Sequence, residues 1–290
     1  MKTKTLFFLV CHFFMFPLFA QGEGSNFTMW QLPTLHDYIG NAYVFQMDNG
    51  KIAVMDGGMD VDDHYLKGFL GALGNEVEAW FISHPHGDHV GALNEILRNP
   101  GFLKIKTIYH SELPEGYYKH SRRSDSIISA YYERLNNSGA EVINLTEPGT
   151  VIKIDETQFK ILTVANPNLK HKIINNASMV IRVWDEDKSM LFLGDLEEEG
   201  GDSLLNSQYR NELDCDYIQL SHHGQQGVKM DFYRSVSFTA CFWPTPTWLY
   251  SNDIGDGFNT GPYKTIETRE LIDSLGVEQY FNTGGLVRID

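Results

Sequence analysis

Long apolar segments are scarce in this chain of 290 residues. The longest runs from Leu6 to Phe19, which is shorter than the ~20 apolar residues of a membrane span, and His12 and Pro17 interrupt it. There is also no internal repeat and no low-complexity tract longer than a few residues, which excludes a repeat architecture. With 42% hydrophobic and 21% charged residues, the composition is that of a folded globular protein with a sizeable core.

Basic residues are few as well. The chain has 23 Lys and Arg against 38 Asp and Glu, a formal net charge of −15. A charge this negative disfavours general binding to nucleic acids or anionic membranes, so we expect no stable nucleic-acid partner. A local basic site is still allowed, and bound metal cations would themselves supply positive charge.

The N-terminal segment has the pattern of a secretory signal peptide. Lys2 and Lys4 precede the apolar run, and Ala20 offers a small residue at the cleavage position before Gln21. We predict a signal peptide over 1–20, with an uncleaved anchor as the alternative. The mature chain, 21–290, is then a single domain, secreted or periplasmic, with no membrane span. Its charge becomes −17, because the segment removes two lysines and no acid.

Cysteine is rare, with three in the chain. Cleavage after residue 20 leaves Cys215 and Cys241, both in apolar, strand-like stretches. An exported protein can join such a pair in a disulfide, but cysteine is also among the most buried residue types as a free thiol. The sequence leaves both possibilities open.

Strand and helix patterns alternate along the chain. Asn49-Gly50 predicts a hairpin between strands 41–47 and 51–55. Apolar spacing predicts helices over 60–73, 114–138 and 265–275, and one through Leu204 and Leu205. Further strands are expected at 77–83, 104–109, 142–145, 150–154, 159–164, 178–184, 189–193, 217–220 and 238–242, and the chain is expected to end in a β-pair of 279–281 with 286–289. Two β-rich halves with helices predict an α+β sandwich rather than a doubly wound parallel sheet.

The densest chemistry lies in one loop between an apolar strand and a helix. It reads His84-Pro85-His86-Gly87-Asp88-His89. His84 and His86 are two residues apart, so in an extended loop they point the same way, whereas Asp88 and His89 at the helix start point differently. This spacing can serve two metal ions side by side. Imidazole and carboxylate donors at this density suit zinc best, with iron or manganese possible.

Two later features fit the same site. Asp195 follows an apolar strand and Gly194, which permits close approach of the backbone. His222 and His223 stand at the end of another strand, in Ser-His-His-Gly. Each is weak evidence alone, since a carboxylate at a strand end is usually a cap or turn residue. Together with the histidine loop, they indicate the second half of one metal site.

These motifs resemble those of the metallo-β-lactamase superfamily, from about residue 27 onward. The His-x-His-x-Asp-His loop matches residues 84–89, and the family's bridging aspartate matches Asp195. The stretch 175–180, the Leu-Gly-Asp and His-His-Gly motifs and the ending 280–285 resemble the hydrolase domain of DNA-uptake competence proteins, to which secreted phosphorylcholine esterases are similar. The resemblance implies an αββα four-layer sandwich with the site at one edge.

The resemblance also implies residue roles. The expected metal ligands are His84, His86, Asp88, His89, Asp195 and His223. The expected catalytic residues are Asp88, Asp195 and His222, with His222 facing the substrate, although the motif leaves open which of His222 and His223 binds metal. In the family, the metal ion bound by the first two histidines of the loop, here His84 and His86, has a third histidine ligand. The sequence departs from the family at this third histidine. There it offers Asn176, as a weak ligand or a substrate contact, while water or His171 could also complete the site.

The predicted function is hydrolysis by a water that zinc, as one or two ions, activates; manganese or iron is possible. The favoured substrate is a small-molecule or polymer phosphoester or phosphodiester. The alternatives are amide, lactone or thioester hydrolysis on the same fold, or a weakly metallated binding module without catalysis.

Overall fold

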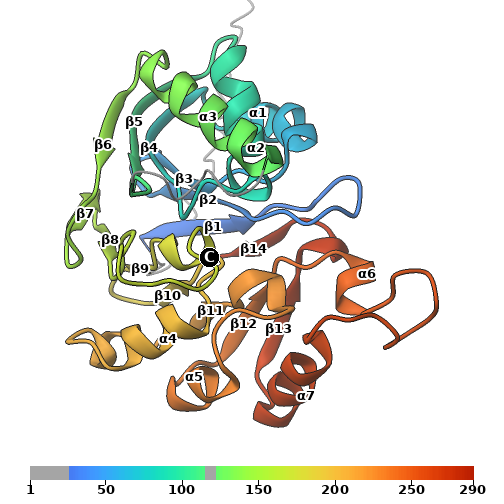
Figure 1. Cartoon of the computed structure of the whole chain (residues 1–290). Helices are drawn as coiled ribbons and strands as arrows, with labels where there is room; N and C mark the ends of the chain where they lie inside the picture. The colour runs from blue at the N-terminus through green and yellow to red at the C-terminus, as the bar shows by residue number, and fades with distance from the viewer. Residues whose placement is uncertain (1–25, 115–121) are drawn as a thin grey trace, which may run out of the picture.

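The computed structural model describes residues 26–114 and 122–290 (Figure 1). The predicted signal peptide and the first part of the predicted helix 114–138 lie outside these ranges. Within them, no helix combines the length and the apolar character that crossing a bilayer requires.

Two seven-stranded mixed sheets form the centre of the fold. The first sheet has the order β14-β1-β2-β3-β4-β5-β6, with bounds β14 Val287–Ile289, β1 Phe27–Gln31, β2 Ala42–Met47, β3 Ile52–Asp56, β4 Glu76–Phe81, β5 Lys104–His110 and β6 Glu141–Asn144. The second has the order β13-β12-β11-β10-β9-β8-β7, with bounds β13 Glu278–Phe281, β12 Ala240–Trp243, β11 Tyr217–Gln219, β10 Ser189–Phe192, β9 Ile181–Trp184, β8 Thr157–Ile161 and β7 Val151–Ile154.

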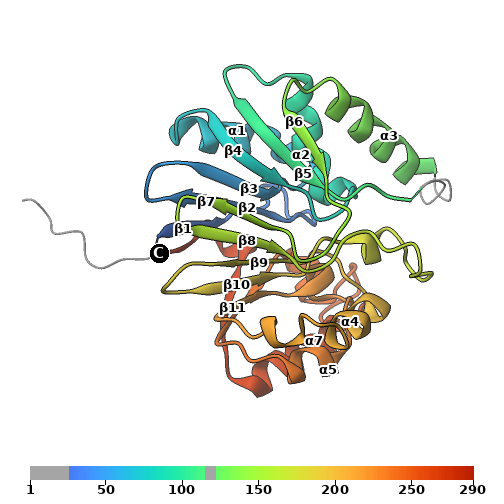
Figure 2. The same ribbon diagram turned by 90° about the vertical axis from the view of Figure 1, so that its left-hand side faces the viewer.

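Helices cover the outer face of each sheet (Figures 1 and 2). The first sheet carries α1 Asp63–Ala72, α2 Gly87–Arg98 and α3 Arg122–Asn136. The second carries α4 Glu198–Leu205, α5 Met230–Ser235 and α7 Thr265–Leu275, with the short α6 Thr247–Tyr250 beside them. The layer order is helix, sheet, sheet, helix, which confirms the predicted αββα sandwich.

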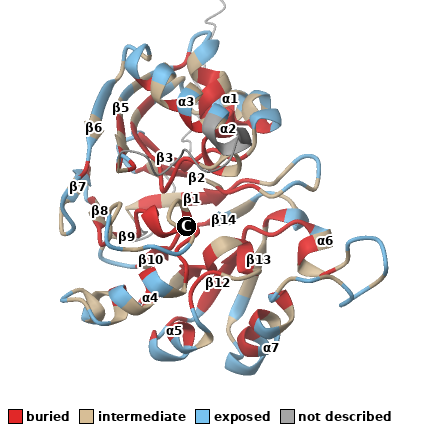
Figure 3. Cartoon of the chain, in the orientation of Figure 1, coloured by how far each residue is buried: buried red, intermediate tan, exposed pale blue. Residues whose placement is uncertain are grey.

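Aromatic side chains fill the space between the sheets. Phe81 of the first sheet stacks on Phe159 of the second with ring centroids 4.9 Å apart, and Tyr43 meets Phe192 at 4.7 Å. Separate apolar clusters lie between each sheet and its helices, so the buried residues form layers (Figure 3). The sheets are therefore fixed against each other, and loops from both can meet at one edge with defined geometry.

The hairpin predicted at Asn49-Gly50 is confirmed, since β2 and β3 pair antiparallel and Gly50 has a φ of 83°. The predicted pairing of the last two strands is wrong. β13 pairs parallel with β12, and β14 pairs antiparallel with β1 in the other sheet. The turn Asn282–Gly284 carries the chain across, and the buried Asn282 accepts a hydrogen bond from the Thr245 amide (3.1 Å). β1 and the short helices α5 and α6 were not predicted from the sequence.

Cys215 and Cys241 are buried free thiols in this structure. Burial raises the pKa of each thiol to about 12, so neither is a reactive thiolate.

Candidate metal centre

The histidine loop connects β4 to α2 and includes the first residues of α2. His84 is buried, and His86 is the extended residue that precedes the helix (φ −77°, ψ 155°). Asp88 and His89 occupy the first helical turn, so they face a different direction from His84 and His86, as their spacing predicts. A carboxylate in the first turn also suits the positive end of the helix dipole.

Asp195 reaches the centre from the second sheet because Gly194 turns the chain after β10. Gly194 has a φ of 56°, and a Cβ there would lie 2.9 Å from the Cβ of Ser83. Only glycine combines this backbone with this close approach between the two halves. The amide of Asp195 then donates to Ser178 Oγ at 3.0 Å, which fixes the carboxylate inward.

Three successive left-handed residues place the last two imidazoles. The φ angles are 48° at His222, 57° at His223 and 71° at Gly224. A left-handed conformation costs a non-glycine residue about 1–2 kcal/mol, so two in a row indicate a functional constraint. The result is that His222 and His223 both approach the carboxylate of Asp195.

The two oxygens of Asp195 face two different groups of donors. Oδ1 lies 3.1 Å from His89 Nε2 and 3.4 Å from His223 Nε2. Oδ2 lies 3.7 Å from His84 Nε2, which is itself 3.0 Å from His86 Nδ1. The donor atoms fall into two sets, each mutually within 4.8 Å and both including Asp195: Asp88, His89, Asp195 and His223 in one, and His84, His86 and Asp195 in the other.

The first of these sets has the polar atoms that a metal site requires. His89 Nε2, His223 Nε2 and Asp195 Oδ1 are buried, and none has a hydrogen-bond partner among the described residues. The two nitrogens lie 3.1 and 3.4 Å from this oxygen but form no well-directed hydrogen bond with it, and burying polar atoms in this state costs free energy. Ligation of a cation removes this cost, and nitrogen and carboxylate donors fit zinc, iron or manganese. The residues therefore fit a divalent metal.

In three of the imidazoles, the nitrogen that faces away from the centre is held as it is in metal sites. His89 Nδ1 lies 2.7 Å from Asp56 Oδ2, His223 Nδ1 lies 2.9 Å from the carbonyl of Pro244, and His84 Nδ1 lies 3.1 Å from Ser83 Oγ. Such contacts fix the ring orientation and leave the opposite nitrogen for the metal. Asp56 and Ser83 were missed from the sequence. The available signal was that Asp56 ends a buried strand before Gly57-Gly58, much as Asp195 follows one.

The charges of the centre suit a cation. Burial opposes ionisation of Asp195, but the neighbouring histidines, His223 first, hold its pKa well below the usual range. Burial, assisted by His89, lowers the pKa of His84, so this imidazole is neutral. Burial acts the same way on His223, but Asp195 and Asp88 outweigh it and raise that pKa to about 9. A proton on His223 therefore competes with a metal ion for Nε2.

Asn176 is not directed at the centre. Its Oδ1 accepts from the amides of Glu197 and Gly200, both at 3.1 Å, and its Nδ2 donates to the carbonyl of His171 at 2.6 Å. These bonds satisfy the start of α4, which is the role of a capping residue. The His171 side chain is exposed, and the structure does not bring it into either donor set.

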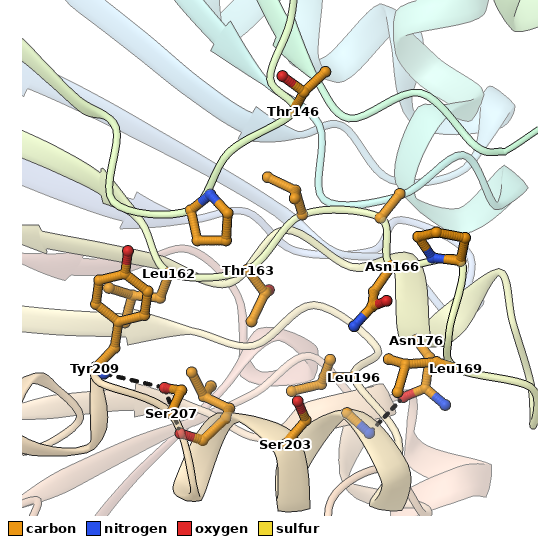
Figure 4. A pocket seen from close by; sticks show the side chains of 16 residues that line it. Thr146, Leu162, Thr163, Asn166, Leu169, Asn176, Leu196, Ser203, Ser207 and Tyr209 are labelled. Atoms are coloured by element: carbon orange, nitrogen blue, oxygen red, sulfur yellow. Dashed lines mark hydrogen bonds between the residues drawn. The ribbon is translucent and has the colours of Figure 1, made fainter.

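Asn176 instead lies at the wall of a cavity of about 330 Å³ between α4 and the loop after β8 (Figure 4). Thr163, Ser203 and Tyr209 also line it, and the wall is mainly apolar. Apart from Asn176, no residue that the sequence assigned to the site contributes to this cavity.

Comparisons with known proteins identify the family and the fold. Residues 37–217 match the family model described as the metallo-beta-lactamase superfamily. Among curated proteins, the chain is similar to ComE operon protein 3 of Bacillus subtilis, with 27% identity over 160 residues, which is 55% of this chain and 19% of that protein. The match thus spans about a fifth of the length of that relative.

Two solved structures show the same fold. The metallo-beta-lactamase fold protein YhfI from Bacillus subtilis is 13% identical with a TM-score of 0.55, covering 91% of this chain and 99% of its own. CmlA, a diiron beta-hydroxylase from Streptomyces venezuelae, is 9% identical with a TM-score of 0.54, covering 92% of this chain and 54% of its own. At these identities the likeness concerns the fold alone.

Proposed function

The chain belongs to the metallo-beta-lactamase superfamily, and from its site we propose that it is an exported hydrolase that cleaves phosphoester bonds with the help of divalent metal ions. The resemblance inferred from the motifs is confirmed by the family match and the curated relative. The family and the His/Asp donor cluster together support a metal-dependent hydrolase. The phosphoester substrate, the preference for zinc and the export are our proposals.

One observation carries the proposal. The two donor sets share the carboxylate of Asp195, one oxygen facing each set. A shared carboxylate suits two cations side by side, and paired cations clamp the attacking and leaving oxygens of an in-line displacement at phosphorus. When bound, the metal supplies an activated water and polarises the phosphoryl oxygen.

The residues of the chain then have separate tasks. Asp195 is buried and holds both sides of the centre at a fixed separation. Asp88 is more open, with 22% of its side chain exposed, and its Oδ2 lies 3.0 Å from His223 Nε2. We assign Asp88 to ligation and to accepting the hydrogen bond that orients the attacking water, and we place the substrate on this open side.

Turnover of bis-p-nitrophenyl phosphate tests the proposal. Protein loaded with zinc or manganese is expected to cleave this diester, and Asp195→Ala is expected to abolish cleavage. Asp155→Ala, which removes a carboxylate from the turn between β7 and β8, is the matched control and should leave the rate unchanged. Absence of turnover on any phosphoester, with metal content verified, would contradict the proposal.

The same preparation separates the alternatives. Turnover of nitrocefin or a thioester, without phosphoester cleavage, would identify an amide, lactone or thioester hydrolase. Metal content well below one ion per chain would favour a binding module. Zinc, manganese and iron are distinguished by elemental analysis of protein purified without added metal.

Export rests on the pattern of residues 1–20 alone. It is tested by the N-terminal sequence of the protein recovered outside the cytoplasm. A mature chain that begins at Gln21 supports export and cleavage, retention of Met1 in that fraction would contradict cleavage, and recovery of the protein only from the cytoplasm would contradict export.

A further inference from the structure

His222 approaches the side of Asp195 that faces His84, not the side that faces His223. Its Nε2 lies 3.8 Å from Asp195 Oδ2, nearly the same as the 3.7 Å from His84 Nε2 to that oxygen. The two successive left-handed residues therefore send neighbouring imidazoles to opposite oxygens of one carboxylate. His223 belongs to one donor set, whereas His222 lies outside both, near the Asp195 oxygen that faces His84.

The polar neighbours of His222 fix the orientation of its ring. Its Nδ1 lies 2.8 Å from Glu197 Oε1, and an ionised carboxylate accepts but cannot donate. Around Nε2 are the side-chain amides of Gln225 at 3.2 Å and Asn175 at 3.5 Å, each of which can donate. The ring is thus oriented with Nδ1 toward Glu197 and Nε2 toward Asp195 Oδ2.

Glu197 is built as a fixed partner for this ring. It is buried, with 2% exposure, and its Oε1 also accepts from Asn175 Nδ2 and Lys172 Nζ, both at 3.0 Å. As with Asp56 behind His89, a buried carboxylate lies beside the far nitrogen of the imidazole, although at His222 the contact is close without being a well-directed hydrogen bond.

We propose that His222 supplies the third imidazole of the metal site formed by His84 and His86. The motif resemblance placed that histidine between the two halves, where the stretch around Asn176 has only His171, which lies outside both donor sets, and it assigned His222 to the substrate. The structure offers the replacement from the second half, one residue before His223. The inference rests on the proposed function only in assuming that the centre binds metal.

The geometry requires one adjustment. The donor atoms of His84, His86 and Asp195 lie within 4.8 Å of one another, and His222 joins them at Asp195 Oδ2. Ligation needs the His222 ring to shift toward the other two histidines. Its side chain is 18% exposed, and the shift would lengthen its contact with Glu197 or carry that carboxylate along.

The test measures metal binding, not turnover. His222→Gly removes the imidazole and suits the left-handed backbone, so the fold is expected to persist. Zinc-loaded protein freed of excess metal is expected to lose about one ion per chain relative to wild type. Added imidazole is expected to restore it. His171→Ala is the matched control, since that histidine is exposed and should leave the metal content unchanged.

A second measurement counts the bound histidines directly. In cobalt-loaded protein, each metal-bound imidazole gives an exchangeable N–H proton signal that the paramagnetic ion shifts, and His222→Gly is expected to lose the His222 signal. Glu197→Gln keeps the His222 ring but removes the charged partner behind it. The affinity for the ion bound by His84 and His86 should fall about 10–100-fold, as is usual when a ligand loses such a partner.

Unchanged metal content and an unchanged number of shifted signals, with turnover alone reduced, would overturn the proposal and return His222 to a substrate contact. Both readouts are independent of any substrate. If no phosphoester is cleaved but His222→Gly loses an ion, the proposed function fails and the ligand assignment stands.

Discussion

Nδ1 of His89 lies 2.7 Å from Oδ2 of Asp56, and both side chains are fully buried. The same carboxylate accepts from the Ser83 amide and hydroxyl, each at 2.8 Å, and from Asn41 Nδ2 at 3.0 Å. Asp56 is therefore immobilised from several directions and fixes the ring of His89. Its Nε2 can point only toward the centre.

Replacing Asp56 tests this support. Asp56→Asn keeps the size of the side chain but exchanges an accepting oxygen for a donating NH₂ group. We expect the affinity of the set containing His89 to fall about 10–100-fold. Competition with a chelator measures the dissociation constant. Asp155→Asn, at the half-buried turn between β7 and β8, is the control, and an unchanged constant in Asp56→Asn would refute the role of this contact.

Asn176 is expected to act on stability and not on metal binding. Asn176→Ala leaves the amides of Glu197 and Gly200 without their acceptor, which should lower the free energy of unfolding by about 1–3 kcal/mol. Urea unfolding of the metal-free protein measures the loss, and elemental analysis should find the same metal content. Asn206→Ala, at the other end of α4, is the control. A clear loss of metal from Asn176→Ala would restore the ligand role that the sequence suggested.

Gly194 is expected to tolerate no side chain. Gly194→Ala imposes a left-handed alanine and brings its Cβ within 2.9 Å of Ser83 Cβ and 3.0 Å of Ser178 Oγ. The combined cost is roughly 2–4 kcal/mol, and the displaced Asp195 should bind metal less tightly. Thermal unfolding and metal titration measure the two effects. Gly50→Ala provides a comparison, because Gly50 is also left-handed but its Cβ would meet nothing within 4 Å. Equal effects of the two substitutions would show that backbone conformation alone accounts for the loss.

His110 predicts how stability depends on pH. Burial lowers its pKa to about 4, against about 6.5 in an unfolded chain. Between these values the unfolded chain binds a proton that the folded chain does not, so stability falls as the pH drops. From pH 7 to pH 5 the loss is about 2 kcal/mol.

His110→Phe removes this titration while keeping a ring against Tyr131 and Tyr132. The difference in unfolding free energy between pH 7 and pH 5 should shrink by about 2 kcal/mol relative to wild type. Urea unfolding in the presence of a chelator isolates the effect from metal release. An unchanged difference would mean that His110 is protonated in the folded chain.

The layers of the fold were predictable because strand and helix patterns alternate along the sequence. The meeting of Asp195 and His223 with the histidine loop was predictable because each lies in a short motif at the end of a strand. The hairpin at Asn49-Gly50 follows from turn chemistry, and the split of the histidine loop follows from its spacing. The pairing of the last two strands was not predictable. Strands that are adjacent in the sequence usually pair with each other. Here each of the last two strands instead adds to the edge of a different sheet, β13 beside β12 and β14 beside β1.

The supporting carboxylates were hidden for a different reason. A single acidic residue at a strand or helix end, such as Asp56 or Glu197, is usually a cap, and nothing local marks it as a partner of a distant imidazole. His222 shows the same limit. Its spacing places it beside His223, but only the left-handed backbone shows that the two rings face different oxygens of Asp195.

Asp195 comes from one sheet and the loop His84–His89 from the other, so any ion between them is a cross-link across the seam of the sandwich. Metal binding then raises the free energy of unfolding. The increase is about 2.7 kcal/mol for a site at a metal concentration one hundred times its dissociation constant. For a chain that is exported, as we propose, the surroundings set the supply of metal. Scarcity of metal would therefore lower the stability of the folded protein as well as its activity. Proteases would degrade the metal-free molecules first, because these unfold more readily.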